Sequence, residues 1–392
     1  MYWVTQMGIL LRAVLLLIFV FGSQGALASE RIRIGVSLGI TGQFKEPAVM
    51  QQRAYEQWRD EVNSRGGLLG HPIDLIIRDD EGIAQKGLTI YRDFVTGGNV
   101  DLVFGPYSSE ITAAVAKTVD TADYPMLAAG ASADEIWKQG YHNIFGMWTP
   151  ASRYTQGILR QAHEAGLNSI AILYANDSFS TEIAAGTRKW GPYLKLKIVL
   201  DEGYAENSPE LIDEIRRAQT SGAELVVIAG HLNEALLAKQ ALRQIGWTPR
   251  AFFATVGPAL PTWSSLVADP ADATFATSIW EPNDSFPLSR EFAAAFEKRY
   301  GVAASYHAAT AYAAGQILEA AINAAGSTER SAVREALFSL DIYTVLGRFA
   351  VDRTGVQVKR LDMLIQWQDG RKEIVWPEEI RTRPPKFGSG TP

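Results

Sequence analysis

The sequence of 392 residues contains no cysteine. The chain therefore has no disulfide framework, no cysteine-based metal site or nucleophile, and no thiol to carry a lipid anchor after a leader segment. Histidine is also scarce, and the five histidines show neither an i,i+4 pair nor an HExxH spacing. These absences argue against a zinc hydrolase, and the sequence predicts no metal site and no cofactor.

Positive charge is in short supply as well. The chain has 37 lysines and arginines against 43 aspartates and glutamates, which gives a formal net charge of −6. No basic stripe is present, so neither nucleic acid nor an anionic membrane surface is an expected partner. Hydrophobic residues at 47% and charged residues at 20% are typical of an ordinary globular protein. Small molecules remain as the ligand class.

Long apolar runs are absent after the N-terminus. There, Arg12 precedes an apolar run over 13–21, a polar break over 22–25, and Ala26-Leu27-Ala28. This pattern predicts a secretory signal peptide over residues 1–28, since the apolar run is shorter than the roughly 20 residues that a membrane span needs. We therefore expect a soluble protein exported to the periplasm that is not a lipoprotein.

Short β-branched runs alternate with segments of helical period along the rest of the chain. The predicted elements of a first series are strands 31–37, 73–78 and 102–104 and helices 47–64, 88–95 and 111–119; those of a second series are strands 170–174, 225–229 and 251–254 and helices 208–220 and 233–245. This alternation predicts an α/β fold with mostly parallel sheets. Because the chain is longer than one core usually covers, two lobes are expected.

Several short motifs follow one another in a characteristic order. They are Gly39-Ile40-Thr41-Gly42, Val62-Asn63-Ser64-Arg65-Gly66-Gly67, Phe104-Gly105-Pro106-Tyr107-Ser108-Ser109, Gly130-Ala131-Ser132 and Asp352-Arg353-Thr354-Gly355. In this order and spacing the sequence resembles the leucine/isoleucine/valine-binding protein family, the type I periplasmic solute-binding proteins of ABC importers. The resemblance extends over essentially the whole chain after the leader.

The resemblance implies two doubly wound α/β lobes joined by three crossover strands, near 148–151, 279–282 and 351–361. The implied parts are an N-terminal lobe of 29–149 plus 281–351, a C-terminal lobe of 150–280 plus 352–380, and a flexible tail over 381–392. The tail is also indicated by its content of proline, glycine and basic residues. A ligand is expected between the lobes, which close around it by a hinge movement.

Two turns of the first lobe are the predicted ligand contacts. Ser109 follows strand 102–104 and opens helix 111–119, where free N–H groups and the helix dipole attract a carboxylate. On pattern alone Ser109 more often caps its own helix, whereas the resemblance favours ligand binding. In the family the next turn binds through a backbone carbonyl and a hydroxyl, and these positions match Gly130 and Ser132.

The second lobe departs from the family's amino-acid binders. The resemblance aligns ligand-contacting residues with Phe179, His231 and Thr255, and at Thr255 a neutral hydroxyl stands where the family carries an acid for the ligand's ammonium. A hydroxyl cannot neutralise a buried ammonium. Either Asp177 or Glu281 substitutes for that acid, or the ligand is an aromatic or aliphatic acid or an amide.

Four aromatic residues at loop or crossover positions are placed where they would face the cleft. They are Phe44, Tyr107, Trp148 and His307, of which we predict Tyr107 and His307 as ligand contacts. For each of these side chains, packing in the core is the alternative. An apolar body with a polar tip suits either role.

The predicted function is that of a monomeric binding component that delivers a carboxylate-bearing small molecule to an ABC transporter permease in the inner membrane. An enzyme is not expected, since Ala133-Asp134 after Ser132 breaks the nucleophile-elbow pattern. A sensor that presents its ligand to a membrane receptor or kinase stays open, because it would use the same binding fold.

Overall fold

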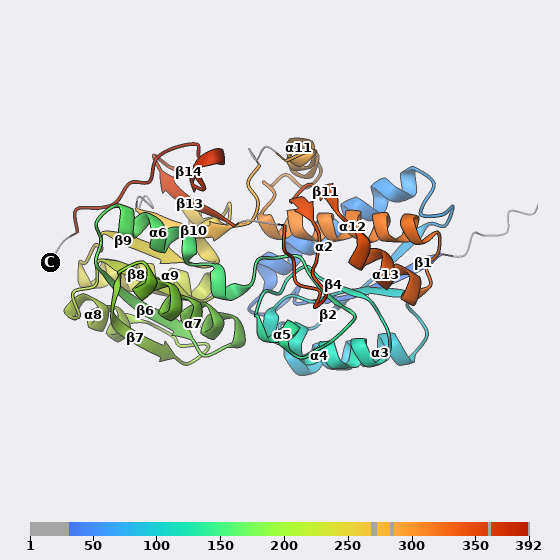
Figure 1. Ribbon diagram of the computed structural model, residues 1–392, viewed down its shortest axis with the longest axis horizontal. Helices are drawn as coiled ribbons and strands as arrows, with labels where there is room; N and C mark the ends of the chain where they lie inside the picture. The colour runs from blue at the N-terminus through green and yellow to red at the C-terminus, as the bar shows by residue number, and fades with distance from the viewer. Residues whose placement is uncertain (1–30, 268–272, 283–285, 360–361, 391–392) are drawn as a thin grey trace, which may run out of the picture.

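The computed structural model describes residues 31–267, 273–282, 286–359 and 362–390. The predicted signal peptide over 1–28 lies outside these residues. The described chain forms two α/β lobes side by side along the long axis, and the chain runs between them near the middle (Figure 1). In this part of the chain no helix is long and apolar enough to cross a membrane.

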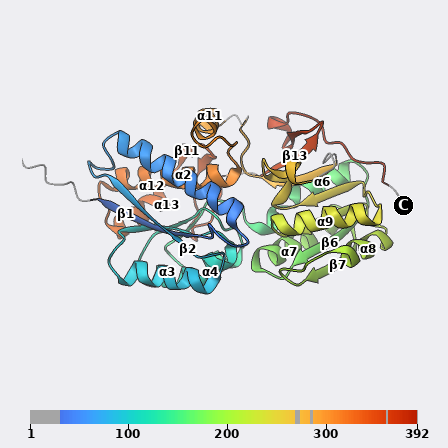
Figure 2. The same ribbon diagram turned by 180° about the vertical axis from the view of Figure 1, so that it is seen from behind.

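The first lobe is built on a five-stranded parallel sheet in the order β2-β1-β3-β4-β5. Its strands are β1 (Ile32–Leu38), β2 (Ile73–Asp79), β3 (Leu102–Phe104), β4 (Met126–Ala128) and β5 (Ile144–Gly146). The strands are mostly apolar because helices cover both faces. Helices α2 (Lys45–Ser64) and α12 (Tyr306–Ala325) pack together on one face, and α3 (Ala84–Thr96) and α4 (Ser109–Thr121) on the other (Figure 2).

Shorter elements complete this lobe. They are α5 (Glu135–Lys138), α11 (Ser289–Tyr300), α13 (Arg330–Ser339) and a small antiparallel hairpin of β11 (Ile342–Thr344) and β12 (Gly347–Phe349). Helix α13 packs on α12, and α11 packs on α2. Segments from both ends of the sequence therefore share one lobe.

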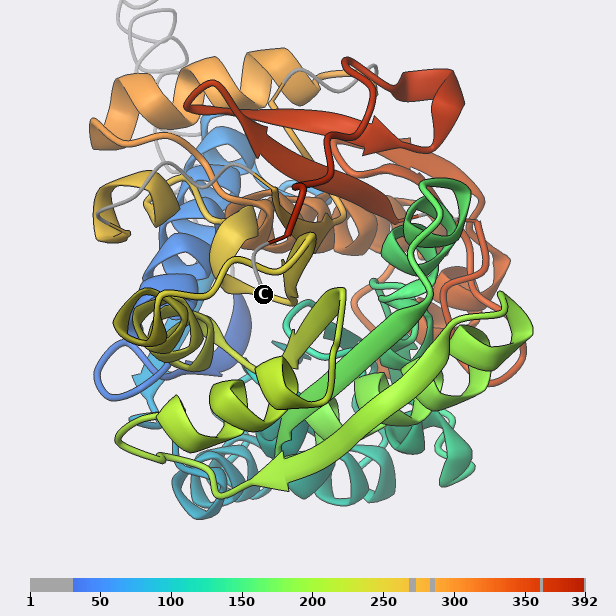
Figure 3. The same cartoon turned by 90° about the vertical axis from the view of Figure 1, so that its left-hand side faces the viewer.

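The second lobe contains a seven-stranded sheet in the order β14-β13-β10-β9-β8-β6-β7. Its strands are β6 (Ser169–Ala175), β7 (Lys197–Tyr204), β8 (Leu225–Ala229), β9 (Ala251–Ala254), β10 (Thr274–Ser278), β13 (Met363–Gln368) and β14 (Arg371–Trp376). Viewed along the long axis, β14 and β7 lie at opposite edges (Figure 3). The strands from β7 to β10 run parallel, and β13 and β14 join them in antiparallel fashion.

Four helices cover this second sheet, and three short helical segments flank them. Helix α6 (Gln156–Glu164) packs with α7 (Ser178–Tyr193), and α8 (Ile212–Thr220) packs with α9 (Leu232–Ile245). The short segments are η1 (Ala151–Arg153), η2 (Gly257–Ala259) and α10 (Trp263–Leu266), and a further turn, η3 (Glu378–Ile380), follows β14. The predicted α/β class with parallel sheets is confirmed, although α8 begins at Ile212 and not at Ser208.

The chain passes between the two lobes after β5, after β10 and after β12. Two contacts hold these passages together. The Thr277 hydroxyl donates to the Tyr154 carbonyl oxygen at 2.6 Å, and the Gly146 N–H donates to the Gly355 carbonyl oxygen at 2.7 Å. Gly355 has φ +83°, and a Cβ there would lie 2.1 Å from the Ile144 carbonyl oxygen, so only glycine fits this approach.

The described part of the tail, 381–390, for which a flexible segment is predicted, contacts the second lobe. The Gln366 side chain binds Lys386 through both of that residue's backbone groups, and the Gly388 N–H donates to the Arg250 carbonyl oxygen at 2.8 Å. The Phe387 ring packs 5.2 Å from that of Phe275. A side-chain amide and one aromatic ring thus fix a segment that has little apolar character of its own.

Candidate ligand-binding site between the lobes

The carboxyl ends of the parallel strands of both sheets supply the loops that line the cleft between the lobes. This is the edge at which open α/β sheets bind ligands. The predicted site residues that follow these strands are Tyr107 and Ser109 after β3, Gly130 and Ser132 after β4, Phe179 after β6, His231 after β8 and Thr255 after β9. His307 comes from the first turn of α12.

Ser109 links the two predicted turns of the first lobe. Its Oγ accepts hydrogen bonds from the backbone N–H groups of Ser132 and Ala133, both at 3.1 Å. Ser108, and not Ser109, occupies the N-cap position of α4. Both Ser109 and Ser132 are buried. The Ser109 hydroxyl keeps its own hydrogen, which it can donate to a ligand carboxylate.

The turn that carries Gly130 is held rigidly. The Ala129 carbonyl oxygen accepts from the Gln51 amide and from the Trp148 indole N–H, both at 2.9 Å. A Cβ on Gly130 would lie 2.9 Å from both the Pro106 oxygen and the Tyr107 Cα, so a larger residue would push the two turns apart. Trp148, which lies at the first passage between the lobes, therefore positions this turn.

Aromatic rings from the two lobes meet in the cleft. From the first lobe, the Phe44 ring lies 5.4 Å from Tyr107, and Tyr107 lies 5.2 Å from His307. Across the cleft, the ring of His231 lies 4.9 Å from that of Phe44, and within the second lobe it lies 5.3 Å from that of Phe179. These contacts describe a closed arrangement of the lobes.

His307 is fully buried, and neither of its ring nitrogens has a hydrogen-bond partner. Burial, with a smaller effect of His231, lowers the pKa of His307 to about 3, so the ring is neutral. A neutral imidazole offers one donor and one acceptor. Ser108 Oγ and Tyr204 Oη are likewise buried without partners. Buried polar atoms are normally hydrogen-bonded, so these groups are exceptions among the described residues.

In the second lobe, the hydroxyl of Thr255, a predicted ligand contact, is bound to the backbone of Gly230. Its hydroxyl donates to the Gly230 carbonyl oxygen and accepts from the Gly230 N–H at 3.0 Å, which ties the ends of β8 and β9 together. Because the only hydroxyl hydrogen is used in this way, Thr255 has none left to donate. A contact between Thr255 and the ligand stays a prediction.

The two candidate replacements for the missing acid also differ. Glu281 is buried and pairs with Lys372 at 2.7 Å, so its charge is already compensated. Asp177 caps α7 by accepting from the Ser180 N–H at 2.9 Å, and it lines a pocket between the lobes. Of the two, Asp177 alone faces that pocket.

This pocket lies between Phe44 of the first lobe and Phe179 of the second, and its cavity volume is only about 20 Å³. Its acidic lining residues are Glu110, Asp177, Glu206 and Glu234. Burial, followed by the charges of Glu110 and Asp177, raises the pKa of Glu206. Among the described residues that line it, no lysine or arginine is present. The pocket therefore carries a negative potential.

Glu46 is a cleft residue that the sequence did not single out. It lies in the first turn of α2, and its Oε1 accepts from the Thr262 hydroxyl of the second lobe at 3.3 Å. Its Oε2 is buried without a partner. Burial, opposed by the Thr262 hydrogen bond, raises the pKa of Glu46 to about 6. At the N-terminus of a predicted helix, this residue resembled an ordinary acidic cap.

Tyr154 is a second such residue. Its ring packs 5.7 Å from Phe179. Burial raises the pKa of Tyr154, the charge of Asp362 adds to this, and the Ser132 hydroxyl opposes it. The only signal in the sequence was an aromatic residue close after the first expected crossover.

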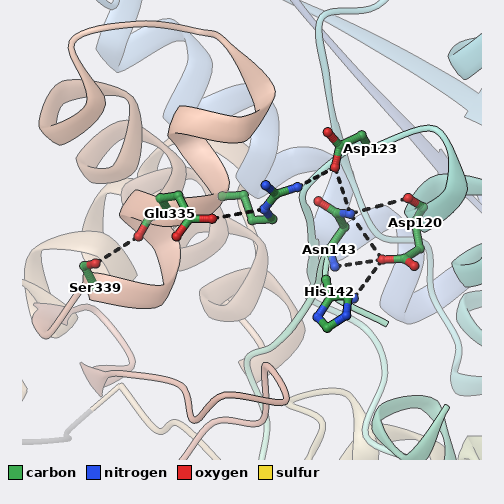
Figure 4. Close-up of polar contacts among 7 residues, drawn as sticks. Asp120, Asp123, His142, Asn143, Glu335 and Ser339 are labelled. Atoms are coloured by element: carbon green, nitrogen blue, oxygen red, sulfur yellow. Dashed lines mark hydrogen bonds and ion pairs between the residues drawn. The ribbon is translucent and has the colours of Figure 1, made fainter. Parts of the chain in front are cut away.

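A different hollow, on the first lobe, has polar groups that bind one another (Figure 4). Asp120 accepts from the backbone N–H groups of His142 and Asn143 at 2.8 and 2.9 Å and from the Asn143 side-chain amide at 3.2 Å. Arg334 forms an ion pair with Asp123. These contacts join α4, α13 and the loop before β5, and they indicate a structural role.

Residues 31–372 match the family model described as periplasmic binding protein, and the chain belongs to this family. The Leu/Ile/Val-binding protein homolog 7 of Brucella suis is 26% identical over 370 residues, which cover 90% of this chain and 92% of that protein. The family suggested by the sequence motifs is therefore confirmed.

Two solved structures share the fold. The branched-chain amino acid transporter substrate-binding protein LivJ from Streptococcus pneumoniae, in complex with isoleucine, has a TM-score of 0.80 at 21% identity and covers 89% of this chain and 100% of that one. A solute-binding protein of an ABC transporter from R. palustris, in complex with benzoate, has a TM-score of 0.78 at 18% identity and covers 88% and 96%. The type I periplasmic binding protein fold is confirmed.

Proposed function

We propose that this chain is the extracytoplasmic solute-binding component of an ABC importer. It captures a small molecule between its lobes, encloses it by hinge closure and delivers it unchanged to a membrane permease. The observation that carries this proposal is the interlobe cleft, where buried groups such as His307 and Ser108 lack partners within the protein. Such groups favour a molecule that satisfies them when the lobes close.

The ligand carries a carboxylate that binds at the paired turns of the first lobe. Ser109 and Ser132 bring hydroxyl groups to the N-terminus of α4, where the helix dipole favours an anion. The aromatic rings of Tyr107, Phe179 and His231 enclose the remainder of the ligand. Gly130 and His307 complete the contact set. The related proteins in complex with isoleucine and with benzoate support a ligand of this size that bears a carboxylate.

The test is calorimetric titration of the purified chain with amino acids, aromatic and aliphatic acids, and amides. We expect at least one carboxylate to bind, and we expect Ser109→Ala to weaken it about tenfold, since a hydrogen bond to a charged group is lost. Ser339→Ala, on exposed α13, serves as the control. Equal affinities for Ser109→Ala and the unaltered chain would return Ser109 to a purely structural role.

Two further measurements separate this function from its alternatives. Mass spectrometry of the released ligand tests for chemistry, and a changed ligand contradicts the proposal that the chain only binds. Deletion of the chain is expected to abolish uptake of the ligand. If deletion removes only a transcriptional or chemotactic response, the sensor function is the correct one.

A further inference from the structure

Three acidic residues act electrostatically on Tyr107, whose ring packs against Phe44 and His307. After burial, the charges of Glu46, Asp177 and Glu234 raise the pKa of Tyr107, in that order of size. Glu46 comes from the first lobe, whereas Asp177 and Glu234 come from the second. In this arrangement acids of both lobes therefore act on the same residue.

Glu46 stands out among these acids because its charge has no fixed partner. Asp177 caps α7, and Glu234 accepts from the His231 backbone N–H at 2.9 Å. The single contact of Glu46 in the described chain is the 3.3 Å hydrogen bond from Thr262, and its Oε2 is buried and unpaired. A largely buried carboxylate with one oxygen unpaired is costly, and a cation placed beside it removes that cost.

Among the described residues, no lysine, arginine or histidine forms an ion pair with Glu46. Burial, and after it the charges of nearby groups that include Glu46, also raises the pKa of Tyr306. Tyr306 stacks 4.0 Å from His307. His307 is neutral and fully buried. Like Glu46 Oε2, both of its ring nitrogens lack a hydrogen-bond partner.

We propose that Glu46 determines specificity by pairing with a protonated amine of the ligand across the closed cleft. The inference rests on the proposed function and deepens it, because it assigns one end of the ligand to Glu46 and the other to Ser109 and Ser132. The resemblance to the family placed an acid for the ammonium at Thr255, in the second lobe. Here the Thr255 hydroxyl binds Gly230, and the acid comes from the first lobe.

This arrangement makes the cleft selective by charge as well as by shape. A ligand with a protonated amine near Glu46 meets a negative surface that also includes Asp177 and Glu234. A ligand of the same carbon skeleton without nitrogen leaves Glu46 unpaired, and a second carboxylate at that end is repelled. The cleft is therefore expected to distinguish ligands by the presence of an amine and not by the length of the carbon chain.

The experiment is calorimetric titration of the full mature chain with matched pairs of ligands. Each pair shares a carbon skeleton and differs in the amine: L-leucine with 4-methyl-2-oxopentanoate, and L-phenylalanine with 3-phenylpropanoate. The proteins are the unaltered chain, Glu46→Gln and the control Glu56→Gln, on the same helix, where Glu56 accepts from Gln52. Glu46→Gln keeps the size of the side chain and removes its charge.

We expect the unaltered chain and Glu56→Gln to prefer the amine-bearing member of a bound pair by about tenfold or more, and Glu46→Gln to reduce this preference to less than about threefold. Affinity for the nitrogen-free member should stay level or rise, which a general loss of structure would not produce. The inference is overturned if Glu46→Gln keeps the preference, or if the unaltered chain prefers the nitrogen-free members. Failure of every pair and of every other carboxylate to bind would instead contradict the proposed function, and the inference would fall with it.

Discussion

The cleft between the lobes and the hollow beside Asn143 are both rich in polar groups, but they use them in opposite ways. In the hollow, Asp120 accepts three N–H groups and Arg334 pairs with Asp123 (Figure 4). In the cleft, His307 and Glu46 keep buried atoms without partners. We expect the hollow to contribute to the stability of the first lobe, and we propose that the cleft gives up stability for binding, as functional sites commonly do.

The largest expected effect lies in the hollow. Asp120→Ala removes the acceptor shared by His142 and Asn143, and we expect the free energy of unfolding to fall by about 2 kcal/mol because these are hydrogen bonds to a charged group. Denaturant unfolding measures the loss. Ligand affinity, measured by calorimetry on the folded variant, should be unchanged. A fall in affinity without a fall in stability would reverse the roles given to the two regions.

The next effect concerns His307. His307→Phe keeps an aromatic ring against Tyr107 and Trp148 but removes both unpaired nitrogens. We expect the ligand to bind about tenfold more weakly, equivalent to about 1.4 kcal/mol, while the stability of the free protein stays level or rises. Calorimetry measures the ligand affinity, and thermal unfolding of the same preparation measures the stability. A destabilised variant with normal affinity would assign His307 to packing alone.

The third prediction concerns Glu46 and the pH dependence of the free energy of unfolding. Because its pKa is raised from 4.5 to about 6 by burial, the folded state holds its proton more tightly than the unfolded state. The stability contributed by this group is therefore fully present below pH 4.5 and is lost as the pH rises through about 6.

Glu46→Gln should accordingly become more stable than the unaltered free protein over this pH range, by about 1 kcal/mol at pH 7 after allowance for partial solvent exposure. Unfolding curves at a series of pH values measure the difference between the two proteins. The difference should be constant below pH 4.5 and above about pH 7. A difference that does not vary with pH would show that Glu46 has the same pKa in the folded and the unfolded state.

The smallest expected effect is at the rim of the cleft. Lys138 of the first lobe pairs with Glu182 of the second at 3.3 Å, and Lys138 is largely exposed. Lys138→Ala should change ligand affinity less than about twofold at physiological salt, since exposed ion pairs are worth little. Titration at low and high salt tests this. A tenfold loss would make the rim, and not the buried aromatic centre, the main support of closure.

Much of this architecture was readable from the sequence. The alternation of β-branched and helical-period segments predicted the parallel sheets, and the turns after β3 and β4 were placed correctly at the edge of the first sheet. The periodicity works because each strand and helix buries a face of its own. What the two turns do to each other, with Ser109 accepting from the Ser132 N–H, depends on residues that meet only in the folded chain.

The features that the sequence did not reveal are those that depend on contacts between the lobes or with distant strands. Glu46 was unremarkable beside its neighbours because its environment is set by Thr262, which is far away along the chain. The composition of the tail predicts a flexible segment and gives no sign of the contacts that the tail makes with Gln366 and Phe275. Local composition does not report a partner that lies on another strand.

The three passages between the lobes have a geometric consequence. The passages after β5, β10 and β12 are bound to one another near Thr277 and Gly355, and we expect the lobes to move chiefly by bending about the line of the passages. One opening angle would then describe most of the motion. Two spectroscopic labels placed across the cleft, far from the passages, are expected to report that angle through a single distance.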